Sequence, residues 1–215
     1  MSAIIEFLDV GYNEPAGIKL GGLSFSVSAG ETAVVRCLSR DEESIFPKLC
    51  AGIIPPSYGI VKLFGAEIGR IDGEELQRLR SGKMGFVFSK PTLLSNMRAM
   101  DNVALPLRYH TALDEGVILE KVAGLFEAAG ILPYADKFPP EMPAGIQKIV
   151  SVLRASVMSP EIIIYEDPVF ELDCLAASPV VELIKTLGRK RKSASLIFTC
   201  QPEPAWNFAD RVIKC

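Results

Sequence analysis

The chain has 215 residues and carries 23 Lys and Arg against 26 Asp and Glu, a formal net charge of −3. This balance argues against a nucleic-acid partner, because binding to a phosphate backbone needs a clear basic excess. Hydrophobic residues make up 49% and charged residues 23% of the chain, which excludes wholesale disorder, and no apolar run reaches the ~18 residues that a membrane helix needs.

The first third of the chain is expected to consist mainly of strands. Four short segments bounded by glycine are rich in β-branched or aromatic residues, and they span 4–8, 23–27, 32–36 and 59–64. The segment KLCAG at 48–52 predicts a short helix that leads out of the loop after the third strand.

The middle third is expected to be helical. Apolar residues at helical spacing predict helices over 74–80, 99–109, 115–129 and 147–158. In the helix over 115–129 the apolar side chains predict one broad buried face, made of Val117, Leu119, Val122, Leu125 and Phe126.

The last third alternates strand, helix and strand. The runs IIIYE at 162–166 and ASLIFT at 194–199 are apolar on both faces, and a helix is predicted between them over 177–190. Such runs are typical of a buried parallel sheet. The sequence therefore predicts an α/β fold with a mostly parallel central sheet, an N-terminal antiparallel β portion and a helical insertion. We expect a single domain over 1–215, with a core formed by 1–89 and 159–215 and a helical subdomain over 90–158.

The loop after the strand at 32–36 lies where a phosphate-binding loop would be expected. Such a loop reads GxxxxGK followed by Ser or Thr, whereas residues 37–44 read CLSRDEES. Cys37, Glu42 and Glu43 replace the two glycines and the lysine, and only Ser44 fits. A like-charge contact at about 4 Å costs roughly 4 kcal/mol at an effective dielectric near 20. A triphosphate is therefore not expected here in the usual pose, and the acidic run is interpreted as a solvated first helical turn.

Two acids, Glu166 and Asp167, follow the strand at 162–166. In nucleotide hydrolases the first acid of such a pair holds Mg²⁺ and the second polarises the attacking water. Ser44 and Glu166 are therefore the candidate metal ligands. The five cysteines lack CxxC spacing and are predicted to be reduced thiols, and the single His110 gives no zinc site.

With these segments in register, the chain from about residue 4 to 213 resembles the nucleotide-binding subunit of an ABC transporter. Tyr12 in GYNEP resembles the adenine-stacking aromatic residue. Further segments resemble, in chain order, the Q-loop, the signature segment, the Walker B motif with the D-loop, and the switch region: GFVFSKPTLL at 85–94, PPEMPAGIQK at 139–148, IIIYEDPVFELD at 162–173 and IFTCQPEPAWNFADRVI at 197–213. The stretch NMRAMDNVALPLRYH at 96–110 most resembles the subfamily that serves lipid transporters with MCE-type substrate-binding proteins.

The resemblance implies a P-loop NTPase-like fold, ATP and Mg²⁺ as cofactors, and a membrane permease that docks through a coupling helix. It also implies a homodimer or a heterodimer with an intact ABC ATPase, placed in the cytoplasm at the inner face of the membrane, and we expect no signal peptide. The positions that correspond to nucleotide-contacting ones are Tyr12, Cys37, Ser39, Ser44, Pro143, Gly145 and Asp173.

The departures from the family pattern fall on the residues that contact ATP. Ser89 replaces the Q-loop glutamine, Pro143 the signature serine, and Cys200 the switch histidine, while Glu43 stands at the lysine position and Asp167 at that of the general-base glutamate. Electrostatic stabilisation of the transferred phosphoryl group is the largest catalytic contribution in such enzymes. No catalytic residue is therefore expected, and the chain is predicted to be a non-hydrolysing scaffold or regulatory subunit.

Two other hypotheses remain open at this point. The first is an active ATPase that uses Arg36, Arg40 or Lys48 as its cation and holds Mg²⁺ with Ser44 and Glu166. The second is a free-standing binding module that kept the fold, lost the transporter role, and binds a divalent cation at its acidic loop.

Overall fold

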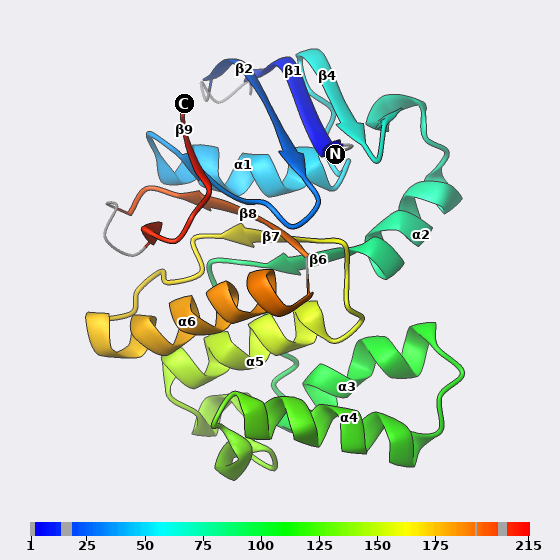
Figure 1. Ribbon diagram of the computed structural model, residues 1–215, viewed down its shortest axis with the longest axis vertical. Helices are drawn as coiled ribbons and strands as arrows, with labels where there is room; N and C mark the ends of the chain where they lie inside the picture. The colour runs from blue at the N-terminus through cyan, green and yellow to red at the C-terminus, as the bar shows by residue number, and fades with distance from the viewer. Residues whose placement is uncertain (1–2, 14–18, 192, 202–205) are drawn as a thin grey trace.

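The protein, as a computed structural model, is described over residues 3–13, 19–191, 193–201 and 206–215. Residues 14–15 of the segment around Tyr12 and residues 202–205 of the switch region lie outside this part. Two sheets form the frame of the described chain (Figure 1). One is antiparallel with strand order β2-β1-β4-β5, and the other is parallel with order β6-β7-β8-β3-β9.

The antiparallel sheet is built from β1 (Ala3–Asn13), β2 (Lys19–Ser28), β4 (Tyr58–Leu63) and the short β5 (Ala66–Glu67). The pairing of β1 with β4 shifts register between Leu8 and Gly11. Gly59 lies opposite this irregularity with φ at 77°, and a Cβ there would come within 2.1 Å of the Asp9 carbonyl oxygen. Only glycine allows the two backbones to approach so closely.

The parallel sheet is built from five strands, which are β3 (Thr32–Arg36), β6 (Met84–Val87), β7 (Ile162–Glu166), β8 (Ala194–Thr199) and β9 (Arg211–Lys214). Neighbouring residues of a strand point to opposite faces, so each face has its own apolar cluster. Val34 and Ile163 belong to one cluster, whereas Val35 and Ile164 belong to the other. The buried parallel sheet predicted from the two-sided apolar runs is confirmed.

Helices cover both faces of the parallel sheet (Figure 1). The helix α1 (Arg40–Cys50) lies between the two sheets, and α5 (Ala144–Ser156) and α6 (Cys174–Arg191) pack on the opposite face. The remaining helices are α2 (Gly73–Lys83), α3 (Ala99–His110) and α4 (Glu115–Ala128), of which α3 packs against both α4 and α5. No helix in the described ranges is long and apolar enough to cross a bilayer.

Two details of the helix predictions are wrong. The helix expected over 48–52 begins at Arg40, because Ser39 caps it, and ends at Cys50. In α4, Val117 and Leu119 are 48% and 36% exposed, while Ile118 is only 2% exposed. The buried stripe runs through Ile118, Val122 and Phe126, which are spaced four residues apart. Val122 and Phe126 are therefore buried as predicted, whereas Ile118 is buried in place of Val117 and Leu119.

Candidate functional site

The candidate site lies where the carboxyl ends of β3, β7 and β8 meet the start of α1. Parallel pairing sets Arg36 opposite Thr199 and Glu166 opposite Phe198. The residues that follow these strands therefore gather at one edge of the sheet. The backbone N–H of Cys37 donates to the Thr199 carbonyl at 3.0 Å, which ties the loop after β3 to the end of β8.

The loop before α1 is closed by the chain's own carboxylate. The Ser39 side chain accepts a hydrogen bond from the Glu42 backbone N–H at 3.3 Å, which starts the helix at Arg40. The Glu42 carboxylate in turn accepts one from the Leu38 backbone N–H at 2.7 Å. A loop N–H that would be available to an external anion thus already has an anionic partner within the chain.

Glu43, which stands at the lysine position of a phosphate loop, is folded inward. Its side chain is only 2% exposed and accepts a hydrogen bond from the backbone N–H of Cys200. Burial raises the pKa of Glu43, nearby Asp167 raises it further, and the hydrogen bonds from Cys200 and the charge of Arg40 oppose this. The expected solvated acidic turn is therefore wrong for Glu43, because this carboxylate bridges α1 and the end of β8.

Asp167 is the second carboxylate at this edge, and its side chain has no solvent exposure. Arg40 lies 3.7 Å from its Oδ2 and stacks over the Phe170 ring at 4.0 Å, while the Thr199 hydroxyl lies 3.4 Å from Oδ1. Burial raises the pKa of Asp167, and Arg40 is the largest influence that lowers it. Arg40, a candidate cation for phosphate, is thus engaged with an acid of its own chain.

Ser89 and Glu166 meet beside this pair. The Ser89 hydroxyl donates to the Glu166 carboxylate at 2.8 Å. Lys148 holds the same segment from α5, because its buried ammonium donates to the Phe88 carbonyl at 3.0 Å and to that of Ser89. Burial lowers the pKa of Lys148 to about 8, although Asp167 and Glu166 oppose this. Sequence reasoning missed Lys148, and the one available signal is a lysine inside the apolar run at 147–158.

The other positions singled out in the sequence support local structure. The Ser44 hydroxyl donates to the Asp41 carbonyl at 3.0 Å, on its own helix. Asp173 accepts from the Ala176 N–H at 2.9 Å at the start of α6. Pro143 is the N-cap of α5, and Gly145 packs so closely on α6 that a Cβ would lie 3.2 Å from the Ala176 backbone oxygen. Tyr12 is half-buried against the apolar cluster that includes α1.

The candidate Mg²⁺ ligands have contacts within the chain. Ser44 and Glu166, the candidate ligands, each have a hydrogen-bond partner elsewhere. Within the described ranges, no group of three or more His, Cys, Asp or Glu is placed to hold a metal ion. The Glu42 carboxylate accepts a hydrogen bond from the Leu38 N–H, and the Glu43 carboxylate accepts one from the Cys200 N–H. Both negative charges would repel a polyanion bound at this loop.

The buried charge of Glu43 predicts an unusual pH dependence. A carboxyl group whose pKa is raised by folding stabilises the fold below its unfolded pKa near 4.3, and this contribution is lost as the pH rises through the folded pKa. Glu43→Gln keeps an acceptor for Cys200 and removes the charge, so we expect it to raise the free energy of unfolding by roughly 1 kcal/mol at pH 7.5.

Urea unfolding of both proteins between pH 5 and 8 measures this effect. The difference between Glu43→Gln and the original chain should shrink towards pH 5. Glu120→Gln, at an exposed position of α4, provides the matched control and should give no pH-dependent difference. A Glu43→Gln difference that is constant between pH 5 and 8 would mean that folding does not raise the pKa of Glu43 and would contradict this prediction.

Comparison with known proteins identifies relatives in sequence and solved structures with the same fold. No protein-family model matches the sequence. The ATP-binding protein MlaF of the intermembrane phospholipid transport system of Haemophilus influenzae is 26% identical over 207 residues, 96% of this chain and 78% of that protein. The ABC transporter ATP-binding protein YtrE of Bacillus subtilis is 29% identical over 186 residues, 86% of this chain and 80% of that protein.

Solved structures show the same fold. A dimeric ATP-binding cassette in a post-hydrolysis state with ADP and Pi has a TM-score of 0.85 at 22% identity, covering 98% of this chain and 93% of that one. CbiO1 from Clostridium perfringens, part of an ABC transporter complex, has a TM-score of 0.86 at 22% identity, covering 100% of this chain and 85% of that one. This chain is therefore similar in sequence to ATP-binding proteins of ABC transporters and has the fold of an ATP-binding cassette.

Proposed function

We propose that this protein is an ABC transporter subunit that does not hydrolyse ATP and acts as a scaffold or regulatory partner in a membrane transport complex. The observation that supports this most strongly is the inward-folded Glu43, whose carboxylate accepts a hydrogen bond from Cys200 at the place where the family pattern has a lysine facing phosphate. A carboxylate there repels a triphosphate, and the ~1 kcal/mol that a helix N-terminus contributes does not offset a repulsion of about 4 kcal/mol.

The neighbouring groups support the same proposal. Arg40 is engaged with buried Asp167, and the Ser89 hydroxyl with Glu166. Cys200 offers no side chain suited to a γ-phosphate, because its thiol is hydrogen-bonded to Glu43, and burial together with Glu43 raises its pKa to about 12. ATP hydrolysis would need each of these groups to be released from its partner.

Titration with a fluorescent ATP analogue and Mg²⁺ tests the proposal. We expect no saturable binding up to millimolar concentrations and no phosphate release above the protein-free blank. A homologue with glycine, glycine and lysine at the three altered loop positions provides the positive control. Saturable micromolar binding with Mg²⁺-dependent phosphate release would overturn the proposal in favour of an active ATPase with unusual residues.

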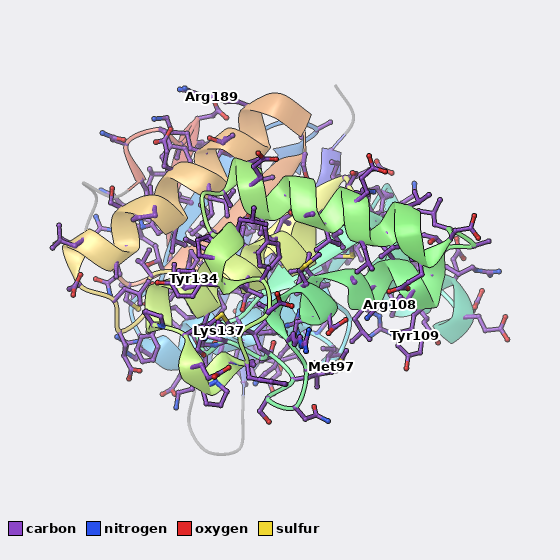
Figure 2. The ribbon with its side chains drawn as sticks, turned by 90° about the horizontal axis from the view of Figure 1, so that it is seen from below. Met97, Arg108, Tyr109, Tyr134, Lys137 and Arg189 are labelled. Atoms are coloured by element: carbon purple, nitrogen blue, oxygen red, sulfur yellow. The ribbon has the colours of Figure 1, made fainter. Side chains whose placement is uncertain are left out.

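We further propose that a permease docks beside α3. A cavity of about 340 Å³, lined by α1, α2 and β6 residues together with His110, opens next to this helix. Figure 2 shows Met97 and Tyr109 near opposite ends of α3 on the side away from α4, and Tyr109 is 77% exposed. We propose that residues 1–89 and 159–215 form the core and that residues 90–158 form the helical subdomain. The coupling helix of the permease would dock on this helical subdomain.

The partner in the complex is proposed from the comparisons. The MlaF relative serves phospholipid transport by its name, and the related cassette structure is dimeric. We propose a complex for lipid or other amphiphilic cargo at the inner membrane face, in which this chain pairs with a second copy or with an intact ATPase. Affinity purification from membranes should recover a permease, whereas a free-standing binding module would recover none.

A further inference from the structure

Three cysteines lie in one row at the edge of the parallel sheet. The last paired residues of β8, β3 and β9 are Thr199, Arg36 and Lys214, which are in register. The next residue of each strand is a cysteine, so Cys200, Cys37 and Cys215 are neighbours in that order. The three are far apart in the sequence, and only the strand order brings them together.

The geometry around Cys37 and Cys215 suits a covalent bond between them. The backbone N–H of Cys215 donates to the Arg36 carbonyl at 3.2 Å, so the ladder between β3 and β9 continues to this pair. Paired strands lie about 4.8 Å apart, which is within the roughly 4.4–6.8 Å between Cα atoms that a disulfide allows. Cys37 and Cys215 follow Val35 and Ile213 by two residues each, and both of those pack in the cluster facing α1, so the thiols share a face.

We propose that Cys37 and Cys215 form a reversible intramolecular disulfide when the protein meets a low-molecular-weight disulfide such as oxidised glutathione. This inference does not depend on the proposed function. All five cysteines are free in the structure.

The order of the chemical steps follows from the two thiols. Cys215 is exposed, and its hydrogen bond from Cys37 lowers its pKa, which favours the thiolate. The Cys215 thiolate attacks one sulfur of the small disulfide, breaks its S–S bond and releases one thiolate. Cys37 then attacks the Cys215 sulfur, loses its proton and releases the second small thiol. In total two protein thiols lose two electrons and two protons, and one small disulfide becomes two thiols.

Cys37 is buried, and its pKa is raised first of all by the hydrogen bond to Cys215 and then by burial. Capping of Cys215 removes the first of these causes, which makes Cys37 more reactive when it is needed. Cys200, the neighbour on the other side, is a poorer partner because its thiol is hydrogen-bonded to the Glu43 carboxylate, which helps to raise its pKa to about 12.

Peptide mapping of the full chain decides between the possible pairs. The reduced protein is equilibrated at pH 7.5 with graded ratios of oxidised to reduced glutathione, alkylated, and digested for mass spectrometry. We expect the count of free thiols to fall from five to three, with Cys37 and Cys215 in one linked peptide. The melting temperature should rise by roughly 5 °C or more and return on reduction, because the new bond closes a long loop.

Variants confirm the order of attack. Cys37→Ser should trap one glutathione on Cys215, Cys215→Ser should form no disulfide, and Cys174→Ser at an exposed site should behave like the original chain. A bond between Cys37 and Cys200, or five free thiols at every ratio tested, would overturn the proposal. Both outcomes are read from the unaltered chain, so the decision does not depend on whether a variant folds.

Discussion

The double substitution Glu42→Gly and Glu43→Lys is expected to give this protein an affinity for Mg²⁺-ATP that is at least about 100-fold higher than that of the original chain. Glycine at 42 frees the Leu38 N–H, which the Glu42 carboxylate now occupies at 2.7 Å. Lysine at 43 replaces a repulsion by an attraction, each about 4 kcal/mol at 4 Å for an effective dielectric near 20. The lost hydrogen bond to Cys200 and the other altered loop positions reduce this gain. We therefore expect a net gain in binding free energy of about 2.7 kcal/mol, which corresponds to a 100-fold higher affinity.

Isothermal titration calorimetry measures the change, with circular dichroism to confirm that the variants fold. The chain offers a matched control in Glu74→Gly with Glu75→Lys, because these residues also stand in the first turn of a helix, α2, behind the cap Asp72. The control changes the net charge equally but should bind no nucleotide. A folded double variant at 42 and 43 without binding would show that the acidic residues are not what keeps ATP out.

The strands of this fold could be predicted from the sequence because their apolar runs are local signals. The runs at 32–36, 162–166 and 194–199 became β3, β7 and β8, with β7 and β8 as neighbours in the parallel sheet. The start of α1 could also be predicted from the sequence, because Ser39 followed three residues later by Glu42 is a capping pattern. The interpretation of the acidic run as a first helical turn agrees with this start, and only its exposure to solvent is wrong for Glu43.

What the sequence could not provide is the contact between distant segments. Glu43 is an ordinary acidic residue of a first helical turn until the end of β8 places the Cys200 N–H beside it. Lys148 is likewise an isolated charge in an apolar helix until the carbonyls of Phe88 and Ser89 accept its hydrogen bonds. Both arrangements depend on the order of strands in the sheet and on which helix packs on which face, and neither leaves a local pattern.

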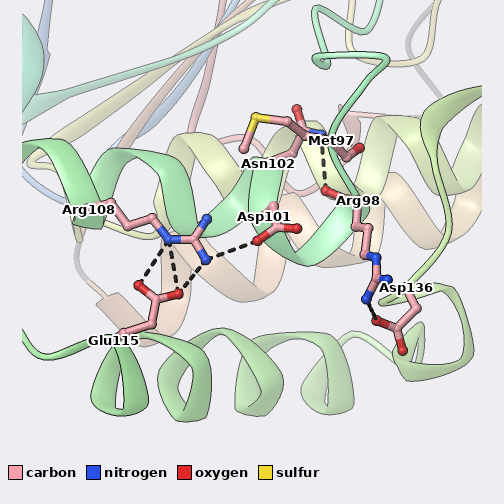
Figure 3. Close-up of polar contacts among 7 residues, drawn as sticks. All are labelled: Met97, Arg98, Asp101, Asn102, Arg108, Glu115 and Asp136. Carbon is pink, nitrogen blue, oxygen red and sulfur yellow. Dashed lines mark hydrogen bonds and ion pairs between the residues drawn. The ribbon is translucent and has the colours of Figure 1, made fainter.

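Asn102 is the buried amide that organises the loop in front of α3, and its loss is expected to destabilise the protein strongly. Its side chain is fully buried, and its Oδ1 accepts from the Leu94 N–H at 2.7 Å. Its Nδ2 lies 3.1 Å from the carbonyl oxygens of Leu94, Met97 and Arg98. Figure 3 shows this side chain turned back towards Met97 and Arg98, while Arg98 itself pairs with Asp136 at 3.0 Å.

We expect Asn102→Ala to lower the free energy of unfolding by about 3 kcal/mol, because several backbone groups lose their partner at a buried position. In a domain of this size the melting temperature should fall by roughly 6–12 °C. Asn96→Ala, at an exposed position of the same loop, is the matched control and should change it little. Equal stability of the two variants would mean that water replaces the amide without loss. A marked loss with Asn102→Ala alone would show that this one side chain fixes the loop that carries Met97 to the proposed permease-facing surface.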